Sequence, residues 1–396
     1  MNLPLRILQI TNRIPYPLND GGNIATWYVA KYLRSYGHTV DLAFLNTNKH
    51  FENPNSITQG YNHSFSVNIN TDIRLKDMLG NLFSSIPYNI ARFESKEFEV
   101  LLIKILKENT YDVIQIEGAY MALYISVLRR HSTAKIVLRS HNIEHKIWQR
   151  LASNTANPVK KLATQYLASQ IKKYEDKTLH LMDAIVAITP DDEAYYRDKN
   201  YRGIVRTIQA GFEDEPLIEN AAQKNTVCFI GSMHWLPNNE GVEWFLNQIW
   251  PLVLKELPRA EFHIAGKGMD GRFDTWKRPS VFLHGLVPNA ATFIQNHSVF
   301  VVPLRSGGGM RLKVVEAMGM RMPIVSTTIG AEGISYTADV DLLIGDTPEE
   351  IKNKIVSLLL DPEFAKRISY NARLKAMNDY SWANLIPKFE KLYNEL

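Results

Sequence analysis

The sequence has 396 residues, of which 45% are hydrophobic and 22% are charged, and its formal net charge is +4. This length predicts two domains rather than one core, and the composition is that of an ordinary globular protein rather than a disordered chain. Residues 1–215 contain 26 Lys and Arg against 22 Asp and Glu, so they carry the whole positive surplus, without a single basic run. We therefore expect no nucleic-acid partner. Anionic ligands and a peripheral membrane contact are compatible with this charge.

Cysteine content and hydropathy indicate the cellular location. The single cysteine, Cys228, lies in an apolar run, so we expect a small core residue and no disulfide. The N-terminus lacks the layout of a signal peptide, and no apolar run approaches the roughly 20 residues that cross a bilayer. We expect a cytoplasmic protein, with a peripheral position on the inner face of the membrane as a further hypothesis.

Short β-branched runs alternate with longer amphipathic stretches along the chain. The predicted strands of the first half are Arg6–Ile10, Thr39–Leu45, Tyr111–Glu117, Lys135–Ser140, Asp183–Thr189 and Val205–Ala210. Those of the second half are Val227–Gly231, Glu261–Ala265, Val281–Leu283, Val299–Leu304, Ile324–Thr327 and Leu342–Ile344. Strands that are apolar throughout predict parallel sheets covered on both faces. Each half is therefore predicted to be an α/β, doubly wound, Rossmann-like unit, and the polar segment Gly211–Thr226 is predicted to be the linker.

Ligands of such sheets bind beyond the carboxyl ends of the strands, so the two units are expected to share a central cleft. Gly21 and Gly22 follow the first predicted strand, after a loop stiffened by Pro15 and Pro17. This glycine pair is a candidate for close approach to an anionic ligand, although a Gly-Gly turn alone is weak evidence.

His141 comes at the end of a predicted strand and is the next candidate along the chain. A lone His is more often a core or surface residue, but this position favours a role in a site. His145 lies four residues later and Glu144 is adjacent, yet the metal-binding order HExxH is absent. We therefore predict no metal site.

A further strand leads through Gly231 and Ser232 into a helix for which Asn238 is a candidate cap. Trp235 and His234 are candidates for the lining of the same site. A packing role under a loop is an equally good interpretation of Trp235.

The most informative segment runs from Val301 to Val325. A strand ends there at Leu304, three glycines follow (Gly307, Gly308 and Gly309), and a helix is predicted from Arg311 to Met320. Consecutive glycines let backbone N–H groups approach an anion, and a helix N-terminus adds its dipole.

Arg311 and Lys313 lie in the first turn of this predicted helix, where positive charge opposes the dipole unless an anion is bound. Glu316, three residues after Lys313, can accept hydrogen bonds from sugar hydroxyls. The alternative interpretation is a glycine-rich turn with a solvated basic pair and a Lys313–Glu316 ion pair.

This segment resembles the donor-binding signature of the retaining family 4 glycosyltransferases, which have the GT-B fold. In that family a Glu, seven residues and a second Glu precede Ala-Met and a Gly-x-Pro turn. Glu316 matches the second Glu, which implies that it holds the donor ribose, whereas the first Glu would fall on Gly308. The sequence thus resembles a branch with a GGGxRxKxxEAM signature, often found in polysaccharide biosynthesis. Donor-sugar contacts then fall to backbone N–H groups around Gly308, Gly309 and Met310.

The resemblance covers most of the chain and implies further site residues. Gly231 and Ser232 match the first turn of the C-terminal domain, where the family usually carries a phosphate-binding Arg and a Lys. Gly285 and Leu286 match a turn whose backbone holds the base. His141 matches a His close to the donor sugar. Gly21 and Gly22 match a loop at the donor phosphates or the acceptor.

The resemblance also implies the domain organisation and the reaction. It implies an acceptor domain over residues 1–215, a donor domain over residues 216–380 and a helix over residues 381–396 that crosses back onto the first domain. The expected reaction is retaining transfer of a sugar from a nucleotide diphosphate donor to a glycan or lipid-linked acceptor, in polysaccharide or cell-surface glycan biosynthesis. Arg311, Lys313 and His141 are the expected catalytic residues. No cofactor or metal is expected, because the two cations stabilise the leaving diphosphate.

Three other functions remain open at this point. A nucleotide-sugar epimerase of the same fold needs an acid–base pair, and no convincing pair stands out. A non-catalytic nucleotide-sugar-binding subunit is compatible with Gly308 in place of a Glu. An NAD-dependent dehydrogenase is disfavoured, because no Gly-x-Gly-x-x-Gly follows the first strand.

Overall fold

The structure is a computed structural model of residues 1–396. It describes residues 3–396 apart from 19–20, 54–56, 58–59, 75–76, 78–79, 82–83, 154, 156, 215 and 219–222. The chain divides into two compact units. The first contains residues 1–209 and 385–396, and the second contains residues 210–384.

The first unit is built on a parallel sheet of seven strands in the order β3-β2-β1-β4-β5-β6-β7. The strands are β1 (Arg6–Thr11), β2 (Thr39–Thr47), β3 (Ser64–Ile69), β4 (Val113–Glu117), β5 (Lys135–Ser140), β6 (Ala184–Ala187) and β7 (Ile204–Thr207). Its helical segments are α1 (Gly21–Ser35), η1 (Asn48–His50), α3 (Tyr88–Ala91), α4 (Lys96–Glu108), η3 (Ala119–Tyr124), α5 (Ile125–His131), α6 (Glu144–Ser153), α7 (Pro158–Leu179) and α8 (Pro190–Asp198). The order reverses between β1 and β4, which is the switch point where ligands of such sheets bind.

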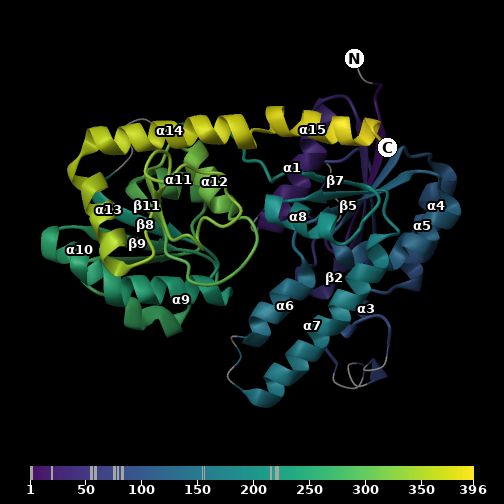
Figure 1. Ribbon diagram of the computed structural model, residues 1–396, viewed down its shortest axis with the longest axis horizontal. Helices are drawn as coiled ribbons and strands as arrows, with labels where there is room; N and C mark the ends of the chain where they lie inside the picture. Colours follow the sequence, from purple (N-terminus) through teal and green to yellow (C-terminus); the bar gives the residue numbers. More distant parts are fainter. Residues whose placement is uncertain are drawn as a thin grey trace. The chain divides into compact units, whose positions relative to one another are not determined.

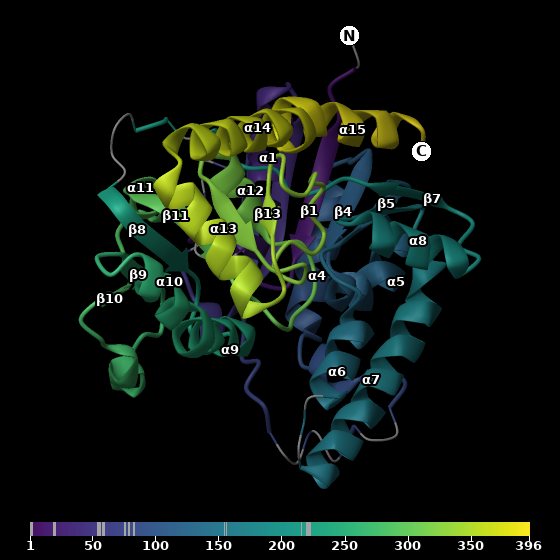
Figure 2. The same cartoon turned by 60° about the vertical axis from the view of Figure 1, so that its left-hand side comes forward.

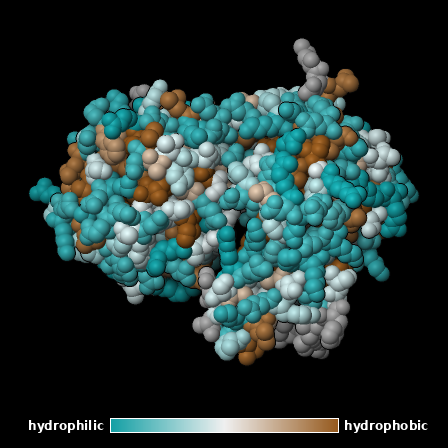
Figure 3. Space-filling model, in the orientation of Figure 1, coloured by the Kyte–Doolittle hydropathy of each residue, from teal (hydrophilic) through white to brown (hydrophobic). Residues whose placement is uncertain are grey.

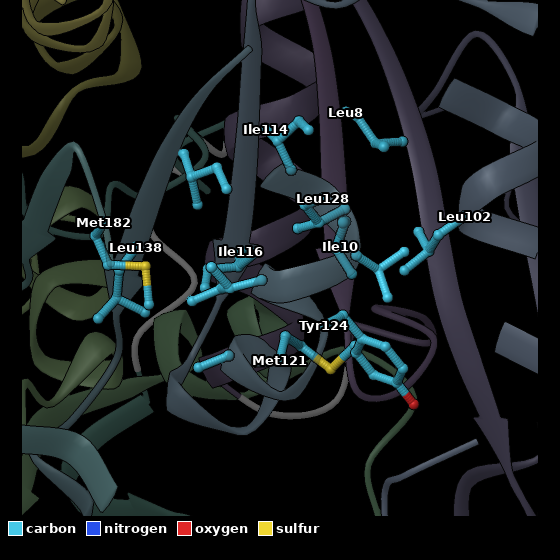
Figure 4. Close-up of a cluster of buried hydrophobic side chains, with 14 of the residues drawn as sticks. Leu8, Ile10, Leu102, Ile114, Ile116, Met121, Tyr124, Leu128, Leu138 and Met182 are labelled. Atoms are coloured by element: carbon cyan, nitrogen blue, oxygen red, sulfur yellow. The ribbon is translucent and has the colours of Figure 1, made fainter. Parts of the chain in front are cut away.

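Successive side chains along each strand point to opposite faces of this sheet. Leu8, Ile114 and Leu138 belong to one large hydrophobic cluster with side chains of α4, η3 and α5, shown in Figure 4. The opposite face is covered by α1 and by the end of α15 (Trp382–Asn394), whose Tyr393 hydroxyl bonds the Gln115 side chain. This second face also carries buried polar residues, which form part of the candidate site.

Helices α6 and α7 form a hairpin that extends from the first unit (Figures 1 and 2). Asn157 caps α7, accepting a bond from the Lys160 N–H, and Pro158 occupies its first turn. The inner residues Thr164, Ala168 and Ile171 are buried. The outer face of α7 is exposed over most of its length.

The second unit is built on a parallel sheet of six strands in the order β10-β9-β8-β11-β12-β13. The strands are β8 (Gln223–Ile230), β9 (Glu261–Ala265), β10 (Val281–Gly285), β11 (His297–Val302), β12 (Ile324–Ser326) and β13 (Leu343–Ile344). Its helical segments are α9 (Leu236–Trp244), η4 (Phe245–Ile249), α10 (Trp250–Glu256), η5 (Gly271–Trp276), α11 (Ala290–Gln295), α12 (Leu312–Gly319), α13 (Pro348–Leu360) and α14 (Pro362–Tyr380). Helices α10 and α13 pack on one face and α12 and α14 pack together on the other (Figure 1).

The predicted fold class, two parallel-sheet α/β units, is confirmed. The prediction missed β3, an edge strand whose residues are only half-buried and alternate polar with apolar side chains. The predicted linker is wrong at both ends. Phe212 is buried and its N–H bonds the Tyr380 carbonyl, and strand β8 already begins at Gln223. Of the remainder, residues 215 and 219–222 lie outside the described residues.

Candidate functional site

A polar network crosses the buried face of the first sheet. Glu117 accepts 2.5 Å hydrogen bonds from the side-chain amides of Gln9 and Gln115 on the same carboxylate oxygen. The Arg139 guanidinium, 0% exposed, lies 3.6 Å from the other oxygen and donates to the Ala25 carbonyl of α1. Buried charges are costly without partners, and packing of the core does not require them. We therefore interpret the network as part of a functional site.

His141 lies at the end of β5, as predicted, and its Nε2 is 2.6 Å from Glu117 Oε2. Burial would raise the pKa of Glu117, but the charge of Arg139 and the hydrogen bonds from His141 and Gln115 lower it to about 2. The carboxylate is therefore ionised at neutral pH. It accepts a hydrogen bond from His141 Nε2–H, so the other ring nitrogen of His141 remains for a different partner.

A cavity of about 680 Å³ opens beside this pair within the first unit. His141, Glu117 and Gly22 line it, together with the described residues Thr11, Asn12, Arg13, Pro15, Asn23, Thr26, Thr47, Lys49, His50, Thr71, Asp72, Ile73, Arg92, Phe93, Gly118, Tyr120, Asn142 and Glu144. These residues come from the segments that follow β1, β2, β3, β4 and β5, from the start of α1 and from the residues after α3. The volume suits a ligand of one or two sugar units.

Glu144 is a second carboxyl group that lines the cavity. Its Oε2 accepts a 3.0 Å bond from the Tyr120 hydroxyl, and Glu175 accepts from the N–H groups of Glu144 and His145. Burial, followed by the nearby charge of Glu175, raises the pKa of Glu144 to about 7. Near pH 7 this side chain is therefore divided between a neutral and a charged form, while Glu117 stays charged.

The glycine-rich segment of the second unit forms a loop between β11 and α12. Gly307 has φ of 119°, and a Cβ there would lie 2.6 Å from Arg311 Nη2 and 3.0 Å from the Trp235 ring. A side chain at this position is thus excluded by both backbone and space. Gly308, Gly309 and Met310 continue the loop into the N-terminus of α12.

Arg311 immediately precedes α12 and is almost fully buried. Its Nη1 donates to the Gly308 carbonyl, its guanidinium lies 5.0 Å from the Trp235 ring centre, and its Nη2 is 3.9 Å from Glu332 Oε2. These contacts fix the guanidinium beside the loop. Trp235 is 37% exposed and covers it, so the structure gives Trp235 a contact at the predicted site.

Lys313 lies in the first turn of α12 and points toward the end of β8. Its Nζ is 3.3 Å from the Ile230 carbonyl and from Asn238 Oδ1, and 4.2 Å from the Phe229 ring centre. Burial, followed by the charge of Arg311, lowers its pKa to about 7. Two basic side chains thus stand together at a helix N-terminus, where positive charge opposes the helix dipole, and this favours an anionic ligand.

The loops at the carboxyl ends of β8, β9 and β10 contact one another through backbone hydrogen bonds. The Gly231 N–H bonds the Ala265 carbonyl at 3.1 Å, and the Gly266 N–H bonds the Gly285 carbonyl at 2.7 Å. A Cβ on Gly266 would lie 1.8 Å from the Gly231 oxygen, so only glycine permits this approach. Ser232 continues the first loop, and Leu286, 76% exposed, follows the last.

Two local predictions need correction. Gly21 and Gly22 are not in a loop but form the first turn of α1, where Gly22 lines the cavity and Gly21 is exposed. Asn238 does not cap α9, which begins at Leu236. Its amide instead donates to the Ser232 carbonyl while its oxygen contacts Lys313.

Helix α12 brings Lys313 and Glu316 to one face, three residues apart. Lys313 is held by the Ile230 carbonyl and Asn238, and Glu316 is half-buried.

In the first unit, His141 and His145 contact different carboxylates, Glu117 and Glu175. Among the described residues no group of three His, Cys, Asp or Glu side chains is placed to hold a metal ion.

Sequence reasoning did not identify Glu117, Glu144, Tyr120 or Arg139 as site residues. A signal was present for two of them. Glu117 and Arg139 are charged residues inside runs that are otherwise apolar, next to Gln9 and Gln115 in similar runs. Charged and polar side chains that are buried in a parallel sheet need partners. These four residues are therefore expected to contact one another.

Comparison with known proteins agrees with this geometry. Residues 224–361, which hold the glycine loop and α12, match the family model of the glycosyl transferases group 1. Over 93% of its length the chain is 26% identical to an uncharacterized 44.6 kDa protein in the cps region of Klebsiella pneumoniae, 94% of which is covered.

Two solved structures extend the comparison to the fold. Sucrose-phosphate synthase from Thermosynechococcus elongatus has a TM-score of 0.68 at 16% identity, with 99% of this chain and 98% of that chain covered. HepE from Anabaena, in complex with UDP, has a TM-score of 0.66 at 12% identity, covering 99% and 100%. The fold is that of the GT-B glycosyltransferases. The family match in the second unit supports a glycosyltransferase of this fold.

Proposed function

We propose that the protein is a retaining glycosyltransferase that binds a nucleotide diphosphate sugar in the second unit and transfers the sugar to a glycan or lipid-linked acceptor. The observation that carries this proposal is a pair of basic side chains, the buried Arg311 and the half-buried Lys313, beside a glycine loop at the N-terminus of α12. HepE, a protein of the same fold, was solved with UDP, and the similar Klebsiella protein lies in a cps region. These relatives favour a UDP-sugar donor and a role in polysaccharide biosynthesis.

In the proposed mechanism the second unit stabilises the leaving group. Arg311, Lys313 and the N–H groups of Gly308–Met310 take the charge that develops on the diphosphate as the glycosidic bond breaks. Glu316 holds the ribose, and the loops at Gly231, Ser232, Gly285 and Leu286 hold the rest of the nucleotide. The acceptor attacks on the face from which the diphosphate leaves, and the diphosphate takes the acceptor proton.

His141 acts from the first unit in this proposal. With its Nε2 proton held by Glu117, the imidazole presents its other edge to the cavity and contacts the sugar or the acceptor hydroxyl. Glu117 is a positioning residue in this proposal, because its carboxylate fixes the His141 ring. The proposal requires donor and acceptor to meet during transfer.

The deciding experiment is a transfer assay with a panel of UDP-, GDP- and dTDP-sugars. Products are read by mass spectrometry in the presence and absence of EDTA. We expect transfer or slow donor hydrolysis with one donor class and full activity in EDTA, because the two cations replace a metal. Activity that EDTA abolishes and Mg²⁺ restores would contradict the metal-free mechanism.

Two alternatives have their own supporting observations. Gly308 replaces a family Glu, which favours a non-catalytic binding subunit, and the carboxyl groups of Glu117 and Glu144 in one cavity favour an epimerase. Donor binding with neither transfer nor hydrolysis would establish the first. An epimerised nucleotide sugar as the product would establish the second.

The lowered pKa of Lys313 gives a pH prediction for donor binding. A bound diphosphate raises this pKa from about 7, so binding of UDP above pH 7 takes up a proton. Affinity for UDP should therefore fall as pH rises from 7 to 9, by up to about tenfold per unit. Calorimetry of UDP binding at pH 8 in HEPES and Tris buffers measures the uptake. Equal binding heats in both buffers would contradict it, and Lys313→Met should abolish the difference.

We also propose that the α6–α7 hairpin contacts an anionic membrane surface. On α7, Val159, Leu162 and Tyr166 recur at helical spacing and are 77%, 69% and 47% exposed. Figure 3 shows hydrophobic side chains at this end of the hairpin. Lys160 and Lys173 are also exposed, so the surface combines apolar and basic groups.

Not every apolar or basic residue of α7 belongs to this surface. Ile171 is buried and Leu167 half-buried, so they pack inward, and Lys172 is paired with Asp176 at 3.0 Å. No helix in the described part of the chain combines the length and apolar character of a membrane span.

Liposome co-sedimentation tests the hairpin contact. We expect Lys160→Gln/Lys173→Gln to weaken binding to vesicles with 30% phosphatidylserine by roughly 30-fold, at about 1 kcal/mol per Lys. Leu162→Gln should weaken it further. Val100→Gln, a 66% exposed apolar position on α4, is the matched control and should bind as the parent. Binding that neither hairpin variant changes would rule out this surface.

A further inference from the structure

The proposed transfer reaction assigns no role to Glu144, a carboxyl group that lines the cavity of the first unit. Glu144 is the first residue of α6, shortly after the end of β5, and Tyr120 and His141 line the cavity with it. A carboxylate at a helix start is favourable for stability alone, because it complements the helix dipole. The surroundings of Glu144 decide between this structural role and a role in binding.

The start of α6 is held from α7 and not by the Glu144 side chain. The Glu175 carboxylate accepts hydrogen bonds from the N–H groups of Glu144 at 2.9 Å and of His145 at 3.2 Å. It also lies 2.6 Å from His145 Nδ1. These bonds satisfy backbone donors that a helix start leaves open, and α7 runs beside α6 in both views (Figures 1 and 2). The cap of α6 therefore does not require the carboxyl group of Glu144.

This carboxyl group receives a single hydrogen bond from the described part of the chain. The Tyr120 hydroxyl donates to Glu144 Oε2 at 3.0 Å. Among the described residues, none donates to Oε1 and no cation forms an ion pair with the group. A carboxylate has acceptor positions on both oxygens, so much of its capacity is unused. Because Glu144 lines the cavity, a ligand there can supply the missing donors.

The surroundings keep Glu144 close to the point at which it ionises. Burial, followed by the charge of Glu175, raises its pKa to about 7, and the bond from Tyr120 opposes this rise. Burial and the charge of Glu144 raise the pKa of Tyr120, so its hydroxyl stays protonated and donates. The other titratable or charged groups around this pair and along the cavity are Glu175, His145, His141, Glu117, Arg92, Arg13, Lys49, His50 and Asp72.

The rings beside Glu144 suit a sugar. The Tyr120 ring meets the Phe93 ring edge-on, with 5.4 Å between the ring centres and 74° between the planes, and both residues line the cavity. A carboxylate that accepts hydrogen bonds from hydroxyls, next to an apolar ring face, is a combination that fixes a small polar ligand. The ligand that fits carries neighbouring hydroxyls and no negative charge near Glu144.

We propose that Glu144, in its ionised form, binds hydroxyl groups of a neutral glycan acceptor in this cavity. The inference rests on the proposed transferase function and adds an acceptor-binding residue to it. Glu144 accepts hydrogen bonds only, and the acceptor proton still leaves with the diphosphate. Tyr120 and Glu175 are positioning residues, because they orient Glu144 and set its ionisation.

Ligand-observed NMR titration of the full chain tests the binding. The probes are methyl β-D-glucoside, methyl β-D-galactoside and methyl α-D-mannoside. We expect at least one to bind, with a Kd that falls about tenfold from pH 6 to pH 8 as Glu144 ionises around pH 7. Affinity for UDP is expected to change in the opposite direction above pH 7, so the two sites are distinguishable.

Glu144→Gln is the deciding variant, because glutamine imitates the neutral carboxyl group in shape. It should weaken binding of the probe at pH 8 by about tenfold or more and remove the pH dependence, while the Kd of UDP stays within twofold. Glu108→Gln, at an exposed carboxylate on α4, is the matched control and should bind the probe as the parent does.

Two further variants should shift the pH profile in opposite directions. Glu175→Gln removes the charge that raises the pKa of Glu144, so the midpoint of the profile should move to lower pH. Tyr120→Phe keeps the ring against Phe93 but removes the hydrogen bond that lowers this pKa, so the midpoint should move to higher pH. A purely structural role of Glu144 predicts no such opposite shifts.

Binding of none of the three glycosides would overturn the inference, and so would Glu144→Gln that binds the probe as the parent does at both pH values. Failure of the proposed function looks different. UDP-sugars would then be neither bound nor turned over, while the chain would still bind the glycoside in a manner that depends on Glu144.

Discussion

Lys313→Met should lower kcat/KM for sugar transfer by about 30- to 1000-fold, with little change in folding. Methionine keeps the packing against Phe229 but removes the charge that the leaving diphosphate needs. Loss of one such charge-assisted contact costs about 2–4 kcal/mol of transition-state stabilisation. Arg311→Lys should have a similar but smaller effect, because lysine keeps the charge without the fork that reaches the Gly308 carbonyl.

Steady-state kinetics with the donor that the transfer assay selects measure this effect. Lys255→Met removes an exposed cation from α10 in the same unit and should leave kcat/KM unchanged. Unfolding temperatures of all variants show whether folding is intact. If Lys313→Met transfers sugar at the parental rate, the diphosphate site is elsewhere.

Glu117→Gln should destabilise the first unit as well as reduce transfer. The substitution leaves the buried Arg139 without its counter-charge. It also places an amide group where the carboxylate accepts a hydrogen bond from the Gln9 side chain. Breaking a buried ion pair costs about 3–5 kcal/mol, which lowers the unfolding temperature by roughly 6–20 °C for a unit of this size. Glu108→Gln, at an exposed carboxylate on α4, should lower it by no more than a degree.

A double variant distinguishes a charge effect from a shape effect. Glu117→Gln/Arg139→Gln leaves no unpaired charge and should recover part of the lost stability. The pKa of Glu117 is lowered from 4.5 to about 2, so its contribution is complete above pH 4.5 and is lost as the pH falls toward 2. Single and double variants of equal stability would show that the Arg139 charge is not the cause.

The sequence was sufficient for the fold because nearly every strand is apolar throughout and most strands are followed by a helical segment. Strands β5 and β9 have the predicted bounds. Strand β3 escaped because an edge strand can alternate polar and apolar residues, and β8 began before the predicted boundary, within the presumed linker. Local residue patterns do not record which strand lies at an edge.

The candidate site was predictable where its residues are adjacent in sequence. The glycine loop, Arg311 and Lys313 lie within seven consecutive residues, Gly307–Lys313, and the structure brings them together. The network around Glu117 combines residues from separate strands, and the pKa of Glu144 is raised by burial and then by Glu175, 31 positions away. Such pairings depend on register and packing, which no local motif encodes. The central cleft, the donor and the stereochemistry stay predictions.

The path of α15 has a consequence for biosynthesis. Residues 385–396 belong to the first unit, where Tyr393 bonds Gln115 across 278 positions and Phe389 is fully buried. Residues 210–384 are contiguous and leave the ribosome earlier, so the second unit can finish folding while the first still lacks one layer of its core. A fragment of residues 1–209 would expose the Gln115 face of its sheet to solvent. A recombinant first unit should therefore carry residues 385–396 joined through a linker, as a rearranged chain rather than a simple truncation.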